Sequence, residues 1–281
     1  MNIALKQLIT SALQEDIGAG DFSTISCIPA TETGKAVLKV KDKGILAGMQ
    51  VAQQIFWHIQ PDCLFVPFMK DGDIMQPGQI AFEITAKVHT ILAAERLVLN
   101  TMQRMSGIAT LTNSYVAMLQ GYHTKILDTR KTTPNFRLLE KEAVKIGGAI
   151  NHRFGLYDMI MLKDNHIDYA GGIVNAINNA HNYVTTHNLN IRIEVETRSL
   201  ADVALVLATC KQKVFRIMLD NFTPMQVAEA VALINKEVET EASGGINKNS
   251  ILQYAATNVD YVSIGSLIHQ AQSVDLSLKA I

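Results

Sequence analysis

Residues suited to catalysis or binding follow short apolar runs in the second half of the sequence. Each run ends in cations, carboxylates or glycines, which are residue types that bind anions, Mg²⁺ or hydroxyl groups. The clusters are Asp128-Thr129-Arg130-Lys131, Lys163-Asp164-Asn165-His166, Glu196, Asp220-Asn221, Ser243-Gly244-Gly245 and Ile264-Gly265-Ser266. Their repeated placement predicts one polar site assembled from several run ends.

The cations in this set indicate an anionic ligand. Cations at or near the run ends are Arg130, Lys131, Arg153 and Lys163. Gathering like charges is costly unless an anion binds among them. Arginine donates two parallel hydrogen bonds to a carboxylate, and His152 beside Arg153 is a further carboxylate donor. The alternative is a structural ion network with Glu140, Glu142, Glu196 and Asp220.

The carboxylates and glycines extend this interpretation. Glu196 and Asp220 are acceptors suited to Mg²⁺ or ribose hydroxyls, although each alone also fits an ordinary solvated carboxylate. Gly244, Gly245 and Gly265 leave backbone N–H groups open to a phosphate, as the last loops of βα barrels do. The alternative for these glycines is that they only form tight turns.

Several familiar sites lack their usual motifs. The sequence has no HExxH or Cys/His spacing for zinc, no GxGxxG after a strand, no P-loop and no GxSxG. His166 by itself is more typical of a satisfied loop residue than of a catalyst. Met159 and Met161 lie on an apolar run and are interpreted as core packing.

The elements that position these clusters alternate between strands and helices. The spacing predicts strands at 125–129, 159–164, 191–196, 215–220, 240–243 and 261–265, with helices between them such as 173–183 and 224–234. This pattern is typical of βα units and a parallel sheet, either open or closed into a barrel. All of the polar clusters then lie at the carboxyl ends of strands, which is the catalytic face of such folds.

The first third of the sequence predicts a mixed α and β segment. A helix begins the chain and ends near Gly18 and Gly20, and a second helix covers 51–59. Strands are predicted at 35–43 and at 80–88, where apolar and polar residues alternate. A long helix over 91–105 follows, and Gly107 is expected to end it.

Composition limits the class of protein. The 281 residues are 48% apolar, which allows one large or two modest globular domains. The net charge of −1 argues against a nucleic-acid or anionic-membrane partner held by bulk charge. No apolar run is long enough to span a membrane. Cys27, Cys63 and Cys210 form no framework, so free thiols and a cytoplasmic location are expected.

Long segments of the sequence carry a family resemblance. Residues 128–166 read DTRKTTPNFRLLEKEAVKIGGAINHRFGLYDMIMLKDNH. Other segments are EDIGAGDFST (15–24), ERLVLNTMQRMSGIAT (95–110), IEVE (193–196), IMLDN (217–221), EASGGI (241–246) and SIGSLIH (263–269). In this order they resemble the quinolinate phosphoribosyltransferase family, also called carboxylating nicotinate-nucleotide pyrophosphorylases. Departures such as Asn135-Phe136 after TTP remove no charged site residue.

The resemblance implies a two-domain α/β architecture. An N-terminal α/β sandwich-like domain is expected over residues 1–114, with the tail at about 267–281 packing back on it. A C-terminal incomplete α/β barrel is expected over residues 115–281. The family barrel is usually described as seven-stranded, whereas the sequence shows six strand-like runs.

The resemblance also implies the reaction and the site. Quinolinate and 5-phosphoribosyl-1-pyrophosphate give nicotinate mononucleotide, pyrophosphate and CO₂ in de novo NAD synthesis, with Mg²⁺ required. The implied catalytic residues are Lys131, Lys163, Glu196 and Asp220, with Glu196 and Asp220 near the metal. The implied substrate-binding residues are those four together with Arg104, Thr129, Arg130, His152, Arg153, Ser243, Gly244, Gly245, Ile264, Gly265 and Ser266.

The family forms head-to-tail homodimers in which an arginine, here Arg104, reaches the partner's active site. A higher oligomer is an open alternative, and from the residues alone Arg104 fits an exposed arginine on a solvated helix face. The sequence leaves three alternatives to this functional interpretation. They are a molybdenum-associated paralogue of the same fold, a Schiff-base barrel enzyme with Lys163 as nucleophile, and a non-catalytic anion-binding module.

Overall fold

A computed structural model describes residues 2–281, and these divide into two compact units. The first unit extends to Ser114 and also takes in Thr132–Gly148 and Leu267–Ile281. The second comprises Tyr115–Lys131 and Ala149–Ser266. The units therefore interleave along the chain. The sequence suggested a boundary between residues 114 and 115 with the tail at about 267–281 returning to the first domain, and it did not suggest that residues 132–148 also belong there.

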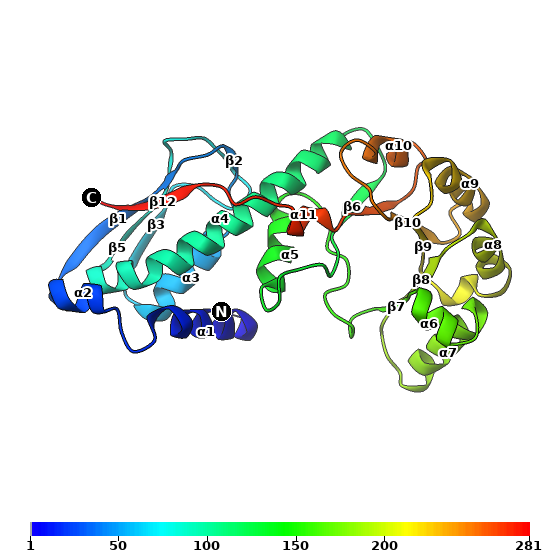
Figure 1. Ribbon diagram of the computed structural model, residues 1–281, viewed down its shortest axis with the longest axis horizontal. Coiled ribbons are helices and arrows are strands. Elements are labelled where there is room, and N and C mark those ends of the chain that lie inside the picture. The colour runs from blue at the N-terminus through cyan, green and yellow to red at the C-terminus, as the bar shows by residue number, and fades with distance from the viewer. Residues whose placement is uncertain (1) are drawn as a thin grey trace. The chain divides into compact units, whose positions relative to one another are not determined.

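The first unit is built on an antiparallel sheet with the strand order β12-β1-β5-β3 (Figure 1). Its strands are β1 (Thr33–Val40), β3 (Leu64–Pro67), β5 (Ile80–Lys87) and β12 (Leu276–Ala280), and β2 (Gly44–Ile45) pairs separately with β4 (Ile74–Met75). Its helices are α1 (Ile3–Ile17), α2 (Phe22–Cys27), α3 (Met49–Ile59), α5 (Arg137–Ile146) and most of α4 (Val88–Met118). The C-terminal tail belongs to this unit because β12 pairs with β1.

The predicted elements of the first third are confirmed. The first helix ends at Gly18, whose positive φ of 53° is accessible to glycine without strain. The alternating pattern of β5 buries Phe82, Ile84 and Ala86, while Lys87 is exposed. The ring of Phe82 packs against those of Phe56 and Phe65 in the core of this unit.

The predicted end of the long helix at Gly107 is wrong. Helix α4 continues through Gly107 to Met118. A Cβ at position 107 would overlap the carbonyl oxygen of Gln272 and lie 2.9 Å from its carbonyl carbon. Glycine stands here because the backbone before β12 passes directly over the helix, and the sequence pattern cannot distinguish this close approach from a helix end.

The second unit contains a parallel sheet with the strand order β6-β11-β10-β9-β8-β7. Its strands are β6 (Lys125–Leu127), β7 (Ile160–Leu162), β8 (Ile193–Thr197), β9 (Arg216–Asp220), β10 (Glu239–Ser243) and β11 (Tyr261–Ser263). Its helices are α6 (Asp164–Tyr169), α7 (Ile173–Thr186), α8 (Leu200–Thr209), η1 (Lys211–Lys213), α9 (Pro224–Ile234) and α10 (Ile251–Ala255), and α11 (Ser266–His269) follows β11. The predicted strands of this half are all confirmed.

The parallel sheet is an incomplete barrel. Strands β6 and β7 occupy its two edges and do not pair with each other within residues 2–281. Beyond β6, Ile150 forms an isolated parallel bridge with Leu127 in the place of a seventh strand. Two residues further on, the His152 N–H donates to the Asp128 carboxylate rather than to a backbone carbonyl of β6, so the bridge does not continue as a strand.

Two sequence expectations on composition can be compared with the fold. Within residues 2–281, no helix is both long enough and apolar enough to cross a membrane. The cysteines are free thiols as expected, with Cys27 exposed and Cys63 and Cys210 buried.

The packing of Gly107 predicts an unusual sign for a helix substitution. Glycine to alanine inside a helix normally stabilises by about 1 kcal/mol. We expect Gly107→Ala to destabilise instead, by about 1–3 kcal/mol, because the new methyl group overlaps the Gln272 backbone. Urea denaturation followed by circular dichroism measures the change, and a more stable variant would contradict the close approach.

Candidate functional site

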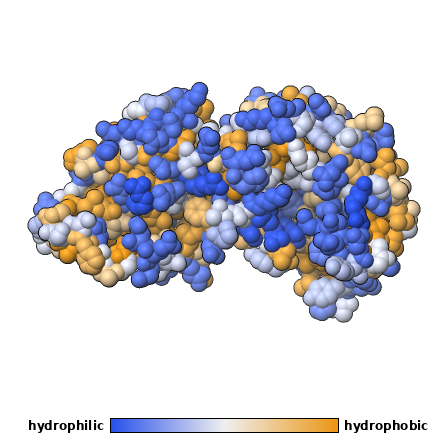
Figure 2. Space-filling view, in the orientation of Figure 1, coloured by the Kyte–Doolittle hydropathy of each residue, from blue (hydrophilic) through white to orange (hydrophobic). Residues whose placement is uncertain are grey.

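The polar clusters lie at one edge of the parallel sheet, as predicted. Every strand pair in this sheet is parallel, so the carboxyl ends of the strands point the same way. Asp128 follows β6, Lys163 follows β7, and Asp220 and Ser243 end β9 and β10 in register with each other. Hydrophilic side chains gather on the face of this unit around β7 and β8 (Figure 2).

Lys163, Glu196 and Asp220 form an electrostatically linked group at this edge. The Lys163 Nζ lies 4.0 Å from Glu196 Oε2, and the Glu196 side chain is buried. Burial raises the pKa of Glu196, the charge of Asp220 adds to the rise, and Lys163 opposes it. A further cation beside the two carboxylates would therefore stabilise their charged forms.

The loop after β10 explains why glycine occupies position 244. Gly244 has a φ of 102°, and a Cβ there would lie 2.8 Å from Asn221 Cγ and 2.9 Å from Asn221 N. The Asn221 backbone N–H donates to the Ser243 carbonyl at 2.8 Å, which locks the ends of β9 and β10 together. Turn geometry and close approach thus account for this glycine, and its contact with a phosphate stays a prediction.

The loops after β11 and β6 are also connected. The Ile264 N–H donates to the Leu127 carbonyl at 3.0 Å, which holds the Ile264-Gly265-Ser266 loop beside the end of β6. The Thr129 hydroxyl accepts the Lys131 N–H at 3.0 Å and shapes the turn that carries Arg130. The last loops and the first loop of the sheet are therefore neighbours.

Arg130 and Arg153 come close enough to repel each other. Burial lowers the pKa of Arg153, and the charge of Arg130 lowers it further, while Glu194 and Asp158 partly compensate. Arg153 is half-buried and Arg130 is exposed. Two guanidinium groups in this arrangement suit a ligand with carboxylates, because each can form a two-point contact.

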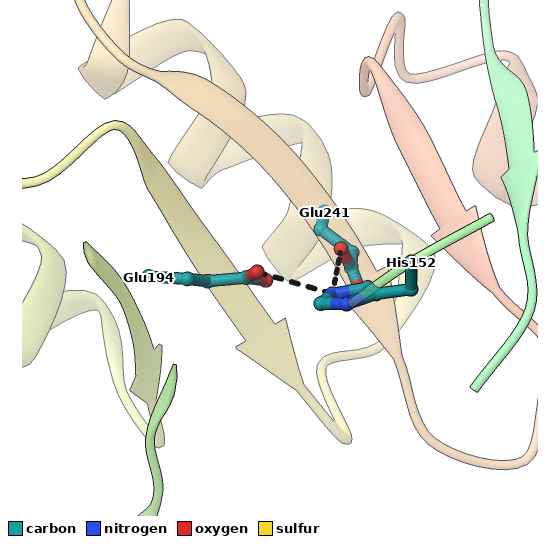
Figure 3. A group of neighbouring side chains, drawn as sticks. All are labelled: His152, Glu194 and Glu241. Carbon is teal, nitrogen blue, oxygen red and sulfur yellow. Dashed lines mark ion pairs between the residues drawn. The ribbon is translucent and has the colours of Figure 1, made fainter. Parts of the chain in front are cut away.

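A buried ion cluster lies deeper between the strands (Figure 3). The Nε2 of His152 is 3.1 Å from Glu194 Oε2 on β8 and 3.2 Å from Glu241 Oε2 on β10. Arg216, on β9 between them, places Nη1 3.0 Å from Glu241 Oε2 and 3.9 Å from Glu194 Oε2. Its Nη2 pairs with the half-exposed Glu239 at 2.8 Å.

Two opposing effects determine which side chains of this cluster carry protons. Burial lowers the pKa of His152, but Glu194 and Glu241 outweigh it and raise that pKa to about 9, which favours an imidazolium. The Nδ1 of the same ring accepts the Arg153 N–H at 2.7 Å, which leaves no room for a proton on Nδ1. The hydrogen bond decides the tautomer, with the ring proton on Nε2. The additional proton then resides on Glu194, whose pKa burial and the Glu241 charge raise.

The sequence analysis did not identify Glu194, Arg216 and Glu241 as functional candidates. Their signal is a charge inside an apolar strand, two or four positions before a site residue. Glu194 precedes Glu196, Arg216 lies four residues before Asp220, and Glu241 precedes Ser243. Because side chains alternate along a strand, these residues face the same side as the site.

Arg104 belongs to the first unit, whereas the strand-end clusters belong to the second unit. Its guanidinium pairs with the fully buried Glu140 at 2.9 Å and donates to the carbonyls of Ile268 and Ala271 at 2.8 Å. Glu140 also accepts the Thr133 N–H at 2.7 Å. The solvated-face alternative for Arg104 is therefore wrong, because the protein fixes this side chain in place.

The sequence interpretations of His166 and of Met159 and Met161 as structural residues are confirmed. His166 lies in the first turn of helix α6, where its Nδ1 accepts the Lys163 N–H at 3.0 Å, so its ring has a structural partner. Met159 and Met161 pack with Met218 and Phe215 in a small apolar core.

Comparison with known proteins identifies the family. Residues 21–106 match the N-terminal domain model of quinolinate phosphoribosyl transferase, and residues 108–279 match its C-terminal domain model. The chain belongs to the quinolinate phosphoribosyltransferase family. A quinolinate phosphoribosyltransferase [decarboxylating] of Nicotiana glauca is 43% identical over 98% of this chain and 82% of its own. A probable carboxylating nicotinate-nucleotide pyrophosphorylase of Bacillus subtilis is 39% identical over 99% and 93%.

Solved structures of the quinolinate phosphoribosyltransferase family share the fold. NadC from Streptococcus pyogenes superposes with a TM-score of 0.91 at 39% identity, covering 99% of this chain and 97% of that chain. The nicotinate-nucleotide pyrophosphorylase from Francisella tularensis gives 0.90 at 35% identity, covering 99% and 96%. The molybdenum-associated alternative receives no support from these relatives.

The buried cluster of this quinolinate phosphoribosyltransferase predicts a pH-dependent loss of stability. Arg216→Met leaves Glu194 and Glu241 without their guanidinium, and we expect a loss of about 3–5 kcal/mol. Both carboxyl pKa values then rise in the folded state, so the variant loses stability as pH increases above the ordinary value of 4.5.

Urea unfolding at pH 5 and pH 8 measures the difference for Arg216→Met. Arg198→Met is the control, because Arg198 makes an exposed pair with Asp168 and its loss should change stability little at either pH. A loss in Arg216→Met that is the same at both pH values would show that Arg216 contributes by packing alone.

Proposed function

We propose that this protein transfers the phosphoribosyl group of 5-phosphoribosyl-1-pyrophosphate to quinolinate. The products are nicotinate mononucleotide, pyrophosphate and CO₂, a step of de novo NAD synthesis. The observation that carries the proposal is the Arg130–Arg153 pair at the carboxyl edge of the parallel sheet, whose two guanidinium groups suit an anionic ligand. The names of relatives that match over nearly the whole chain support quinolinate as that anion.

The two carboxylates of quinolinate account for the cationic part of the site. Arg130, Arg153 and Lys163 supply three positive charges from the loops after β6, before β7 and after β7. Thr129 is proposed to complete this subsite together with Arg104 of the partner chain. His152, expected from the sequence to donate to a carboxylate, instead turns both ring nitrogens toward protein groups and supports Arg153 from behind. The Arg104 guanidinium, held by Glu140, is a fixed rather than a mobile donor in this role.

The sugar donor accounts for the remaining strand ends. Lys131 carries positive charge toward its pyrophosphate, and the Ser243-Gly244-Gly245 and Ile264-Gly265-Ser266 loops offer backbone N–H groups to its 5′-phosphate. Glu196 and Asp220, in adjacent strands β8 and β9, are acceptors for the ribose hydroxyls. Lys131, Lys163, Glu196 and Asp220 thereby surround the reacting centre as its proposed catalytic residues.

The chemistry needs positioning and charge rather than an organic cofactor. The quinolinate ring nitrogen attacks the anomeric carbon, the new C–N bond forms, and the C–O bond to pyrophosphate breaks. Glu196 and Asp220 stabilise positive charge that develops on the sugar. The product pyridinium accepts the electron pair released when the 2-carboxylate leaves as CO₂, and a proton then replaces it on the ring carbon. Fixing both substrates at one edge removes much of the entropic barrier.

Mg²⁺ fits the carboxylate pair. Glu196 is buried near Asp220, and its pKa is raised first by burial and then by the charge of Asp220, so a cation bound there would stabilise the charged carboxylate. Mg²⁺ prefers oxygen ligands and commonly takes one or two carboxylates together with substrate phosphates and water. Glu196 and Asp220 would hold the ion, which when bound neutralises charge on the departing pyrophosphate.

We also propose a homodimer and a cytoplasmic location. The dimer follows from the family resemblance around Arg104, and a higher oligomer is compatible with it. The location rests on three free thiols, which are typical of a reducing compartment. The charge balance gives no support for a nucleic-acid partner.

The direct test is turnover of quinolinate. Incubation with quinolinate, 5-phosphoribosyl-1-pyrophosphate and Mg²⁺ should release nicotinate mononucleotide and one CO₂ per product, measured by chromatography and with carboxyl-labelled substrate. Nicotinate, which lacks the 2-carboxylate, should be a poor substrate because the paired arginines then lose one partner. Ligand binding without turnover would instead support an anion-binding module, and borohydride trapping of Lys163 with a carbonyl substrate would support the Schiff-base alternative.

Subunit complementation tests the shared site. Arg104→Gln, which keeps a donor beside Glu140, and Lys163→Ala should each be nearly inactive as homodimers. A mixed dimer has one site with both defects and one intact site. Random mixing should therefore restore about a quarter of wild-type activity for a two-fold dimer with independent sites. No recovery, with heterodimers verified by native mass spectrometry, would place the action of Arg104 within its own chain.

A further inference from the structure

We propose that Glu241 and Glu194 are positioning residues that hold Arg153 in place through the imidazole of His152. The inference deepens the proposed function and rests on it, because Arg153 is taken as a quinolinate-binding side chain. Neither glutamate touches substrate in this proposal. Their effect travels through one ring and one backbone hydrogen bond.

The imidazole of His152 bridges the sheet to the Arg153 backbone. On one side, Nε2 lies 3.1 Å from Glu194 Oε2 and 3.2 Å from Glu241 Oε2, between strands β8 and β10 (Figure 3). On the other side, Nδ1 accepts the Arg153 N–H at 2.7 Å. The ring is almost fully buried, with 4% of its side chain exposed. A shift of the ring therefore moves the start of the Arg153 side chain.

A second contact ties the same segment to the loop after β6, which carries Arg130. The His152 N–H donates to Asp128 Oδ1 at 2.8 Å, and the Asp128 N–H donates to the Ile150 carbonyl at 3.2 Å. Asp128 is fully buried and lies two residues before Arg130. The backbones of both arginines are thus attached to one rigid support. The spacing between their guanidinium groups depends on that support.

The arginine pair needs such a support because its members repel. Arg130 is among the causes that lower the pKa of Arg153, together with burial. Without a ligand, this repulsion favours conformations in which the guanidinium groups separate. Clamping the backbone beside Arg153 resists that separation and prepares the pair for a dicarboxylate, which reduces the ordering cost of binding.

The cluster is poorly explained by stability alone. The Oε1 atoms of Glu194 and Glu241 are buried without a hydrogen bond to any described residue. A buried ion pair seldom stabilises a fold more than apolar residues of the same volume. Apolar side chains at 194 and 241 would fill the space but could not fix the Nε2–H of the ring. The carboxyl groups of Glu194 and Glu241 are therefore assigned the role of orienting the imidazole of His152.

The same three side chains could also suggest a cation site. Their ligand atoms all lie within 4.8 Å of one another. Arg216, however, already places a guanidinium nitrogen 3.0 Å from Glu241 Oε2 and 3.9 Å from Glu194 Oε2. A metal ion there would face strong repulsion from this charge, so Arg216 is the counter-ion and the ring is the held group.

The test compares neutral variants that differ in their contact with His152. Glu241→Gln and Glu194→Gln keep the shape of each side chain but replace a carboxyl group that faces Nε2–H, charged in Glu241 and protonated in Glu194, with an amide. Glu239→Gln is the matched control, because Glu239 lies on the same strand and pairs with Arg216 but does not pair with His152. We expect the first two variants to raise the KM for quinolinate by about tenfold, with small changes in kcat and in the KM for the sugar donor. Glu239→Gln should leave all three within about twofold of wild type.

A double-mutant cycle separates positioning from general damage. If Glu241 acts through Arg153, then Glu241→Gln added to Arg153→Ala should raise the quinolinate KM no further than Arg153→Ala does alone. Additive effects, or an unchanged KM in both glutamine variants, would overturn the proposal. Thermal unfolding identifies a variant that fails to fold, and Glu194→Gln then carries the cycle in place of Glu241→Gln. Absence of quinolinate turnover in the wild type would instead refute the proposed function.

Discussion

Parallel pairing of short strands is the constraint on which the candidate site depends. Because β6 to β11 all run in the same direction, Asp128, Lys163, Glu196, Asp220 and Ser243 reach one edge of the sheet although they span more than a hundred residues of chain. Each strand contributes one or two polar groups, and the connecting helices contribute none of these. The site can therefore hold several anionic groups at once without a dedicated loop for each.

Charge balance within the sheet supports the residues at its edge. Four ionisable side chains are buried between β8, β9 and β10, where Arg216 pairs with Glu241 and the carboxyl groups of Glu241 and Glu194 both face the imidazole of His152. The imidazole transmits this arrangement to the Arg153 backbone, and Asp128 transmits it toward Arg130. The exposed polar side chains at the edge are thus held in place by buried polar side chains. Functional sites commonly depend on such supporting contacts.

Close approach of another chain segment explains why glycine occupies position 107 in the first unit and position 244 in the second. Gly107 lies inside a helix because the chain before β12 crosses it, and Gly244 lies beside Asn221 because β9 and β10 end together. A Cβ at either position would overlap atoms that are remote in sequence. The same residue type therefore marks a tertiary contact in the first unit and a strand-end loop in the second.

The sequence by itself determined the strands, the helices and the edge at which the polar clusters meet, because periodicity and turn residues are local signals. Its motifs also indicated the family, and the matched domain models establish that the chain belongs to it. Only the tertiary structure decided that α4 continues past Gly107, that Arg104 is held by Glu140, and that His152 turns both ring nitrogens toward protein groups. Each of these depends on residues distant in sequence, since the cost of burying a charge or admitting a Cβ is set by neighbours that only folding brings together.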